Sequence, residues 1–294
     1  VAMNPQSYGD DIKELKSGGY LIYDSSWKRD FGRKDINVLG IPLTELCVNE
    51  FSNPKQRLLF KNLGYVGVLA SIFGMDKDIY IDLINEQFKG KEKLIEPNVK
   101  ALGIGYSYAE KNFKNLCDIK INKSNKTDGL ILTSGNDAAG LGCVYGGATF
   151  CAWYPITPST SLAESYSDYS EKLRKEIGTD KNKFAFIQAE DELAAIGMTI
   201  GANWNGARGF TATSGPGISL MSEFIGLAYF AEVPSVIFDV QRGGPSTGMP
   251  TRTQQSDLLA CAYASHGDTK HVLLIPSDPK ECFDFSVKYF DLAD

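Results

Sequence analysis

The sequence is poor in the residues that mark metal, disulfide and membrane proteins. It has only two histidines, and its six cysteines include no CxxC pair, so no zinc or iron–sulfur site with ligands close together in sequence is expected. Six cysteines in 294 residues are also too sparse for a small disulfide-stapled secreted domain. We interpret them as buried thiols of a cytoplasmic protein, at positions 47, 117, 143, 151, 261 and 282.

Long apolar runs and an excess of positive charge are also missing. No stretch approaches the about 20 apolar residues that a membrane-spanning helix needs, and no signal peptide is recognisable. The formal net charge is -6 at pH 7, whereas a nucleic-acid-binding protein usually presents a basic face. We therefore expect neither a membrane nor a nucleic acid as partner.

The first part of the chain mixes strand-like and helical patterns. Two apolar strand-like runs are followed by three stretches with apolar side chains at helical spacing, at residues 19–24, 36–42, 53–72, 76–88 and 96–113. A polar, lysine-rich passage at residues 120–128 then has the composition of a linker. We predict a smaller α/β domain over residues 1–119 and a linker over residues 120–128.

From Gly129 onward, strand-like and helical segments alternate. Strand-like segments occur at residues 130–132, 148–153, 184–187, 209–213, 235–240 and 271–275, and helical stretches lie at residues 161–177, 190–204 and 218–230. Such alternation with continuous apolar strands predicts a doubly wound parallel sheet of the α/β class, covered by helices on both faces. We predict one such domain over residues 129–294. Because the chain opens on Val1 and closes within an amphipathic pattern, we expect it to be cut at both ends.

Four of the predicted strands run directly into loops of unusual composition. These loops are residues 154–159, 188–192, 214–217 and 241–248. Ligands of open parallel sheets bind beyond the carboxyl ends of the strands. We therefore expect the four loops to project from one edge of the sheet and to form the functional site.

The first two loops each have a structural and a functional interpretation. Pro155 and Pro158 make the first loop rigid, and Ser159 or Thr160 can cap the next helix so that backbone N–H groups point to the loop mouth. A simple proline turn explains the same pattern. The acids at 190–192 suit a helix start, yet a carboxyl group packed against the small residues that follow can also hold or donate a proton.

The other two loops suit anion binding. Residues 213–217 form a glycine-rich turn that can cradle an anion, although it is neither a Walker A loop nor a GxGxxG motif, and a tight turn alone explains it as well. Arg242 follows an apolar strand and precedes two glycines, which suits bidentate capture of a carboxylate or phosphate. A surface salt bridge is the alternative for this arginine.

In order and context, these motifs resemble the alpha subunit of 2-oxoacid:ferredoxin oxidoreductases. The matching segments are Tyr154-Pro155-Ile156-Thr157-Pro158, Glu192 with Gly197, and residues 213–217, 242–248, 250–252 and 254–257. The resemblance covers about residues 135–294 and implies a domain that holds the pyrimidine half of thiamine diphosphate. Residues 1–113 resemble, more weakly, the later part of that family's gamma domain, through residues 3–6 and 21–24. The fused arrangement and the Arg-Gly-Gly-Pro-Ser-Thr-Gly loop favour the 2-oxoglutarate type, and a transketolase-C-like domain is expected after Asp294.

The resemblance implies an enzyme that converts a 2-oxoacid to its acyl-CoA, CO2 and reduced ferredoxin with thiamine diphosphate. It implies that Glu192 hydrogen-bonds the aminopyrimidine ring nitrogen, and that Thr157 and Arg242 hold the substrate carboxylate. The implied cofactor contacts are Tyr154, Pro155, Ile156, Glu192, Ser214 and Gly215. No metal ligand is expected in this chain. Magnesium and a 4Fe–4S cluster are expected in a beta subunit, within a dimer of alpha–beta units that works with ferredoxin and coenzyme A.

Two other functions fit the residues taken without the resemblance. One is the pyrimidine-binding domain of a different thiamine-diphosphate enzyme that uses no ferredoxin. The other is a non-catalytic α/β module whose anion-binding loops serve assembly alone. A cluster-containing partner subunit would argue against the first, and cofactor binding in the presence of a partner would argue against the second.

Overall fold

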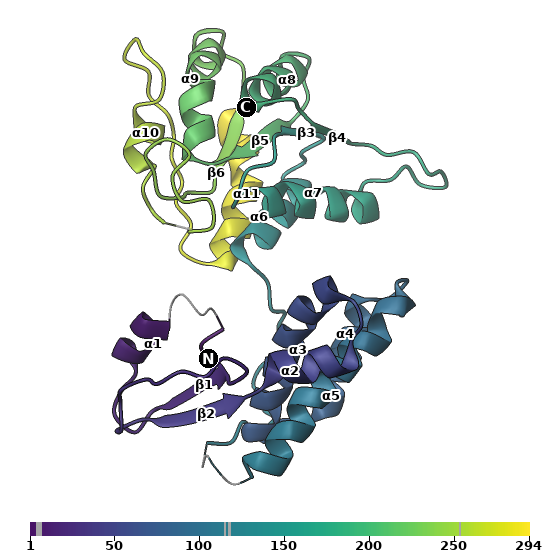
Figure 1. Ribbon diagram of the computed structural model, residues 1–294. Coiled ribbons are helices and arrows are strands. Elements are labelled where there is room, and N and C mark those ends of the chain that lie inside the picture. The colour runs from purple at the N-terminus through teal and green to yellow at the C-terminus, as the bar shows by residue number, and fades with distance from the viewer. Residues whose placement is uncertain (4–7, 115, 117–118, 253) are drawn as a thin grey trace. The chain divides into compact units, whose positions relative to one another are not determined.

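The computed structural model describes residues 1–3, 8–114, 116, 119–252 and 254–294. Residues 4–6, which carry part of the resemblance near the start of the chain, and Cys117 lie outside the described residues. The chain divides into two compact units, Val1–Asp128 and Gly129–Asp294, each of which has its own core (Figure 1).

The first unit combines a two-stranded parallel sheet with a group of helices. Strands β1 (Tyr20–Asp24) and β2 (Asn37–Ile41) pair along their whole length. The helices are α1 (Tyr8–Glu14), α2 (Leu43–Glu50), α3 (Pro54–Ile72), α4 (Lys77–Gln87), the 3₁₀ turn η1 (Glu92–Leu94) and α5 (Ile95–Asn112). The predicted strands and helices of this unit are therefore confirmed, whereas α1 and α2 were not predicted.

Local chemistry explains where α3 begins and what it packs against. The Asn53 side chain accepts a hydrogen bond from the Lys55 N–H at 3.0 Å, and Pro54 occupies the first turn, where its missing N–H has no partner to lose. Val68 of α3, Leu43 of α2 and Ile41 of β2 are completely buried in one cluster. Burial of these apolar side chains fixes the helices against the small sheet.

The second unit is a four-stranded parallel sheet with helices on both faces. The strands β3 (Phe150–Trp153), β4 (Ala185–Gln188), β5 (Gly209–Thr213) and β6 (Val236–Asp239) lie in the order β4-β3-β5-β6. One face is covered by α6 (Gly135–Tyr145), α7 (Thr160–Leu173) and α11 (Pro279–Ala293), and the other by α8 (Glu192–Trp204) and α9 (Gly215–Phe230), next to the short α10 (Leu258–Ala262) (Figure 1). The doubly wound α/β fold is thus confirmed.

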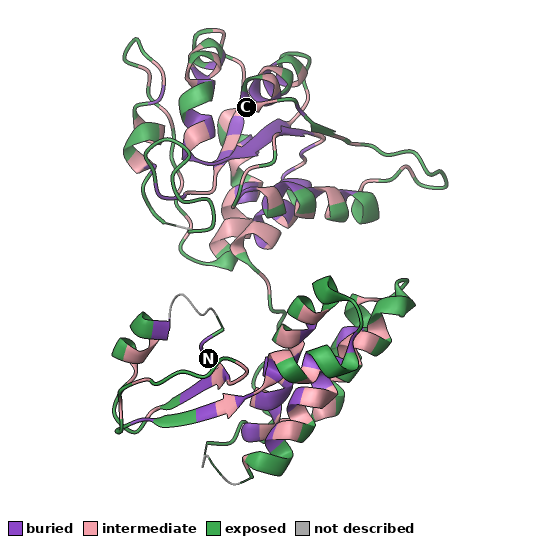
Figure 2. Ribbon diagram, viewed as in Figure 1, coloured by how far each residue is buried: buried purple, intermediate pink, exposed green. Residues whose placement is uncertain are grey.

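Burial within the sheet follows this arrangement. The central strand β5 is buried along its whole length, while the edge strand β4 is largely exposed (Figure 2). Phe210 of β5 packs with Tyr166 of α7 and Phe290 of α11 on one face. On the other face, Ile196 of α8 packs with Met221 of α9. Helices therefore cover both faces of the sheet at its central strands, as the continuous apolar strands predicted, whereas the edge strand β4 stays largely exposed.

Two predicted strands are wrong. Residues 130–132 form no strand, and their three apolar side chains are exposed, so they have neither a pairing strand nor a core. Residues 271–275 also lack a strand partner: the Leu274 carbonyl accepts a hydrogen bond from the Tyr289 hydroxyl at 3.0 Å, and Val272 is exposed. Apolar runs of this length do not distinguish a strand from an extended connection.

The cysteines only partly match the prediction of buried thiols. Five of them are described and free, but Cys261 and Cys282 are half-buried rather than buried. Burial raises the pKa of the Cys143 and Cys151 thiols well above the ordinary value, so these two are inert. Across the described ranges, no helix is both long and apolar enough to cross a membrane.

Candidate functional site

The carboxyl ends of all four strands of the second unit open to one edge of the sheet. Each strand pairs in parallel with its neighbour, so Trp153, Gln188, Thr213 and Asp239 mark the same edge. The four loops singled out in the sequence leave from these strand ends: three lead to the starts of α7, α8 and α9, and the fourth follows β6 on the way to α10 (Figure 1). The predicted convergence of the loops is confirmed.

Arg242 is the most unusual side chain at this edge. It is only 4% exposed, its Nη1 donates to the Thr157 main-chain carbonyl at 2.8 Å, and its buried Nε has no hydrogen-bond partner. Among the residues that the structure describes, no carboxylate forms an ion pair with it. A buried guanidinium that lacks a counter-charge is costly, so this site favours an anionic ligand. The alternative of a surface salt bridge is excluded.

Thr157 and Arg242 are thus brought together, as expected for two residues that share one ligand. The contact uses the main-chain carbonyl of Thr157, and the Thr157 residue itself is exposed. A carbonyl that accepts from Nη1 fixes the orientation of the guanidinium plane and leaves its other N–H groups to a ligand.

The three acids after β4 have separate environments. The Asp191 side chain caps α8 by accepting from the Ala194 N–H at 2.7 Å, and Glu190 is exposed. Glu192 is the first residue of α8 and only 8% exposed, yet no protein group in the described part of the chain hydrogen-bonds its carboxyl group. A buried carboxyl group without a protein partner is suited to share a proton with a ligand.

The start of α9 lies directly against Glu192. A β-carbon on Gly217 would lie 1.9 Å from Thr213 Oγ1 and 3.1 Å from Glu192 Cγ, so only glycine fits between them. Ser214, completely buried, precedes the helix, and its Oγ has no hydrogen-bond partner. In the predicted glycine-rich turn, the backbone therefore closely approaches the side chains of Thr213 and Glu192, and the unpaired Ser214 hydroxyl precedes the helix.

The loop after β3 is rigid, but one expectation about it is wrong. The Ile156 carbonyl accepts from the N–H groups of Ser159 at 2.8 Å and Thr160 at 3.1 Å, and from the Ser159 hydroxyl at 3.0 Å. Neither hydroxyl caps α7. These donors turn inward and do not face the loop mouth. Of the remaining predicted cofactor contacts, Tyr154 is half-buried and Pro155 is exposed.

Two acids near Arg242, the buried Asp257 and the partly buried Asp239, were missed from the sequence. Asp257 is 9% exposed and accepts from the Arg242 main-chain N–H at 3.3 Å. Asp239 is the last residue of β6, and its pKa is raised to about 6, mainly by desolvation. The Cys261 thiol, which donates a hydrogen bond to the Asp239 carboxylate at 3.3 Å, lowers this pKa, and the negative charge of Asp257 raises it further. An acid directly after an apolar strand was the signal for Asp239. Asp257 was part of the matched motif but received no role.

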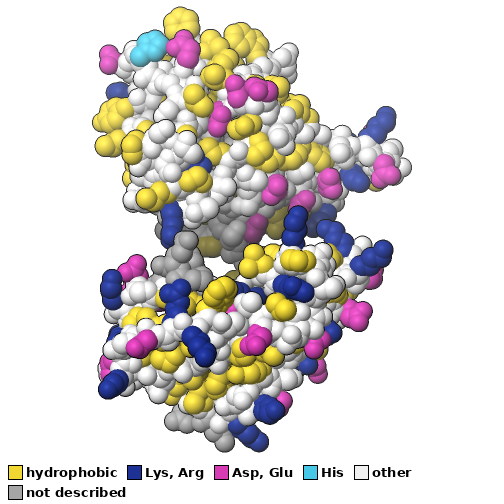
Figure 3. Space-filling model, viewed as in Figure 1, with side chains coloured by type: hydrophobic (Ala, Val, Ile, Leu, Met, Phe, Trp, Pro, Cys, Tyr) yellow, Lys and Arg dark blue, Asp and Glu magenta, His cyan; other side chains and the backbone are white. Residues whose placement is uncertain are grey.

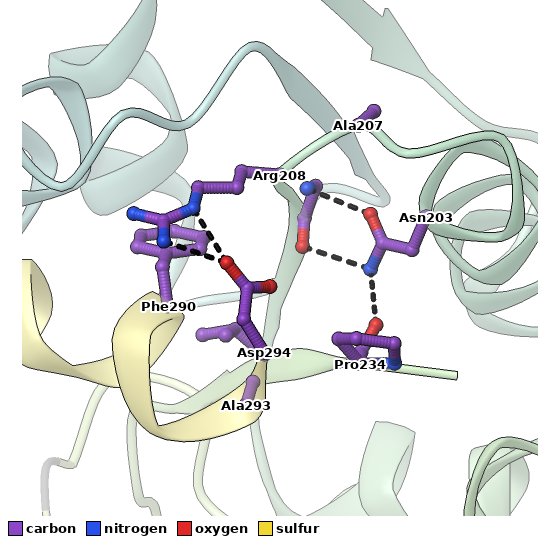
Figure 4. Close-up of a pocket in the computed structure, with 9 residues that line it drawn as sticks. Asn203, Ala207, Arg208, Pro234, Phe290, Ala293 and Asp294 are labelled. Atoms are coloured by element: carbon purple, nitrogen blue, oxygen red, sulfur yellow. Dashed lines mark hydrogen bonds and ion pairs between the residues drawn. The ribbon is translucent and has the colours of Figure 1, made fainter. Parts of the chain in front are cut away.

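The opposite edge of the sheet, at the amino ends of the strands, holds a small pocket of about 10 Å³ (Figure 4). We interpret this pocket as part of the packing of the sheet and not as a ligand site. Asn203 bonds both the N–H of Gly209 at 2.7 Å and the carbonyl of Pro234 at 2.7 Å, which ties α8 to the starts of β5 and β6. Arg208 pairs with Asp294 at 2.6 Å. Every polar group in this set has a protein partner, in contrast to the carboxyl edge.

Comparison with known proteins agrees with this geometry. The family described as "Pyruvate flavodoxin/ferredoxin oxidoreductase, thiamine diP-bdg" matches residues 141–294, and "Pyruvate ferredoxin/flavodoxin oxidoreductase" matches residues 1–108. The chain is 32% identical over its whole length to the 2-oxoglutarate oxidoreductase subunit KorA of Mycobacterium tuberculosis, of which it covers 47%. The chain belongs to the 2-oxoacid:ferredoxin oxidoreductase family.

Two further members of this family that are similar to the chain carry 2-oxoglutarate in their names. The chain is 50% identical over 160 residues to the 2-oxoglutarate synthase subunit KorA of Methanothermobacter thermautotrophicus. The match covers 54% of this chain and 40% of that subunit. A solved 2-oxoglutarate:ferredoxin oxidoreductase from Magnetococcus marinus, with 2-oxoglutarate, coenzyme A and succinyl-CoA bound, superposes with a TM-score of 0.79 at 31% identity. The match covers 99% of this chain and 49% of that one. The chain thus spans about half the length of these relatives or less.

The second unit has residues that fit thiamine diphosphate, the cofactor named for its matched family. Glu192, a buried residue, offers a carboxyl group without a protein hydrogen bond in the described residues, Ser214 offers an unpaired buried hydroxyl, and Gly217 leaves no side chain between Glu192 and Thr213. In the ranges the structure describes, no cluster of three or more His, Cys, Asp or Glu side chains is placed to hold a metal ion.

Proposed function

We propose that the chain is the pyrimidine-binding part of an enzyme that oxidatively decarboxylates a 2-oxoacid to its acyl-CoA, with ferredoxin as electron acceptor. The observation that carries this proposal is the buried guanidinium of Arg242, without a counter-charge, on the same sheet edge as the buried Glu192. The substrate is a 2-oxoacid, whose carboxylate is the anion that such a guanidinium captures. Thiamine diphosphate, when bound, supplies the electron sink for loss of CO2.

In this proposal, different residues of the chain bind the substrate, share a proton with the cofactor and line the cofactor ring. Arg242, oriented by the Thr157 carbonyl, holds the substrate carboxylate beside the reacting carbon. Glu192 shares a proton with the ring nitrogen of the aminopyrimidine, because that carboxyl group has no protein partner of its own. Tyr154, Pro155, Ile156, Ser214 and Gly215 line the cofactor ring.

The substrate we propose is 2-oxoglutarate. Relatives named 2-oxoglutarate synthase and 2-oxoglutarate oxidoreductase subunits support this choice, as does the Magnetococcus marinus enzyme with 2-oxoglutarate bound. The product is succinyl-CoA, by the same likeness. Coenzyme A and ferredoxin reach the site through the assembled complex.

A beta subunit completes the enzyme in this proposal. It contributes the diphosphate and magnesium site and the 4Fe–4S cluster, and two alpha–beta units associate. The outer faces of α8 and α9 support a partner, since large apolar side chains are exposed there, and Figure 3 shows hydrophobic atoms gathered over this part of the second unit. The exposed residues are Leu193, Met198, Trp204, Leu220, Leu227, Tyr229 and Phe230. The free thiols of the described cysteines support a cytoplasmic location.

Kinetics of Arg242 variants in the full-length subunit, assembled with its beta subunit, test this function. Arg242→Ala removes the charge that we propose holds the substrate carboxylate, which for a buried pair costs about 3–5 kcal/mol, or roughly two to three and a half orders of magnitude in kcat/KM. Arg242→Lys should recover only part, since lysine offers a point charge in place of a planar fork. Thr157→Val keeps the main-chain carbonyl that orients Arg242 and removes only the side-chain hydroxyl. The loss of one neutral hydrogen bond should therefore raise the activation free energy by only about 1 kcal/mol.

Cofactor saturation is confirmed separately for each variant, so that a loss in kcat/KM reports substrate capture. Near-normal kcat/KM of Arg242→Ala for every 2-oxoacid tried would place the substrate carboxylate elsewhere and refute the assignment.

A further inference from the structure

Ser256 and Asp257 contact the main chain of Arg242 at the sheet edge, although they lie 14 and 15 residues further along the chain. The Arg242 N–H donates to Asp257 Oδ2 at 3.3 Å, and the Ser256 hydroxyl donates to the Arg242 carbonyl at 2.6 Å. The N–H groups of Ser256 and Asp257 donate to Gln241 Oε1 at 3.0 and 3.2 Å. Both polar groups of the Arg242 main chain are therefore held by two consecutive side chains.

Asp257 also touches the start of α9. A β-carbon on Gly215 would lie 2.3 Å from Asp257 Oδ1, so the carboxylate rests against the first residue of that helix. A negative charge is favoured there by the helix dipole. The Ser214 side chain makes no capping hydrogen bond to α9, so the Asp257 carboxylate lies against a helix start that has no side-chain cap. The same turn carries Gly217, which faces Glu192.

The contact between Asp257 and Arg242 involves the main chain of Arg242 and leaves its guanidinium group without an ion pair to Asp257. Asp257 binds the main-chain N–H of Arg242, and no ion pair joins the two side chains among the described salt bridges. A carboxylate on the guanidinium itself would neutralise it and compete with an anionic substrate. Asp257 therefore fixes the position of Arg242 and leaves its charge available.

We propose that Asp257 is a positioning residue for the 2-oxoacid site: it holds the main chain of Arg242 against the start of α9, and does not itself bind substrate. This inference rests on the proposed role of Arg242. Asp257→Ala should lower kcat/KM about 10- to 100-fold, mainly by raising KM, because a small displacement of a substrate clamp has effects of that size. Asp257→Asn keeps one acceptor oxygen for the Arg242 N–H and should recover most of the loss.

The experiment compares variants of the full-length subunit, assembled with its beta subunit and cofactor. Steady-state kinetics with 2-oxoglutarate are measured for Asp257→Ala, Asp257→Asn, Arg242→Ala and the double variant. Asp180→Asn is the matched control, since its side chain is exposed. If Asp257 acts through Arg242, the double variant is no worse than Arg242→Ala within about 3-fold. Hydrogen exchange at the Arg242 amide should be about 10-fold faster in Asp257→Ala and unchanged in the control.

The outcomes separate this inference from the function it rests on. Wild-type kcat/KM in Arg242→Ala overturns the proposed function, and this inference with it. Faster exchange at the Arg242 amide without a change in KM in Asp257→Ala overturns this inference alone. Losses that multiply in the double variant overturn it too, because Asp257 would then act independently of Arg242.

Discussion

Glu190, Asp191 and Glu192 follow one another in sequence, yet only Glu192 is buried without a protein partner. Glu192→Gln in the assembled enzyme should lower kcat about 100-fold or more, because an amide cannot share the proton that a carboxyl group shares with a ring nitrogen. Glu190→Gln should change kcat by less than about 3-fold, since an exposed charge near a helix start is screened by water.

Turnover of the purified complex measures both variants, and gel filtration confirms that each assembles. Equal losses at the two positions would show that the assignment within the acidic cluster is wrong.

Asp239 is a residue whose burial should make stability depend on pH. Its pKa is raised from 3.8 to about 6, chiefly by desolvation, so the folded chain holds this proton more tightly than the unfolded chain does. Stability from Asp239 is therefore complete below about pH 3.8 and is lost as pH rises through about 6. At pH 8, the ionised Asp239 side chain lowers the free energy of unfolding by about 2–3 kcal/mol relative to its value at low pH.

Asp239→Asn removes this cost. It should raise the free energy of unfolding of the purified subunit by about 2–3 kcal/mol at pH 8 and by close to zero near pH 4. Denaturant titrations across this range measure the difference, with the exposed Asp180→Asn as control. A variant no more stable than the wild type at pH 8 would contradict the proposed burial.

At the scale of elements, the two edges of the second sheet have opposite properties. The carboxyl edge leaves Arg242 Nε and Ser214 Oγ unpaired, whereas the amino edge satisfies its polar groups through Asn203. Unpaired buried groups cost stability, and they are kept where a ligand completes them. We therefore assign the proposed ligand site to the carboxyl edge and a structural role to the amino edge.

A substitution at the amino edge should change stability alone. Asn203→Ala leaves the N–H and carbonyl of Gly209 and the carbonyl of Pro234 without a partner, for a loss of about 2–4 kcal/mol in the free energy of unfolding. The KM for the 2-oxoacid should stay within about 2-fold. Asn205→Ala, which removes a single exposed hydrogen bond to Gly201, is the control and should cost less than about 0.5 kcal/mol. A large rise in KM for Asn203→Ala would argue against the separation of the two edges.

The parallel sheet and the edge at which the four loops meet could be predicted from the sequence, because both depend on local patterns. Apolar strands that end in glycine, proline or charged residues are visible in one dimension, and so is the Asn53 cap of α3. Residues 130–132 and 271–275 carried the same apolar signal but have no neighbouring strand to pair with, and pairing is not encoded locally.

The contacts that define the site depend on long-range packing and could not be predicted. Thr157 was expected beside Arg242 on family likeness, but a bond from the guanidinium to its main-chain carbonyl has no side-chain signature. The Ser256 and Asp257 contacts with Arg242 join residues on either side of a loop whose path no periodicity describes.

At the scale of the whole molecule, the two compact units correspond to two matched families. Residues 1–108 and 141–294 each match one of these families, and the residues that we propose to contact the pyrimidine ring all lie in the second unit. In the proposed function, the partner subunit supplies the other half of the cofactor site. Catalysis is then a property of the complex.

Reduction of ferredoxin by the full-length subunit, alone and assembled with its beta subunit, tests the central claim most directly. The assay supplies thiamine diphosphate, magnesium and coenzyme A, and compares 2-oxoglutarate with pyruvate and other 2-oxoacids. We predict reduction that requires coenzyme A, is fastest with 2-oxoglutarate and is absent without the beta subunit. If no 2-oxoacid supported reduction by the assembled, cofactor-saturated complex, or if the lone subunit turned over, the account would be wrong.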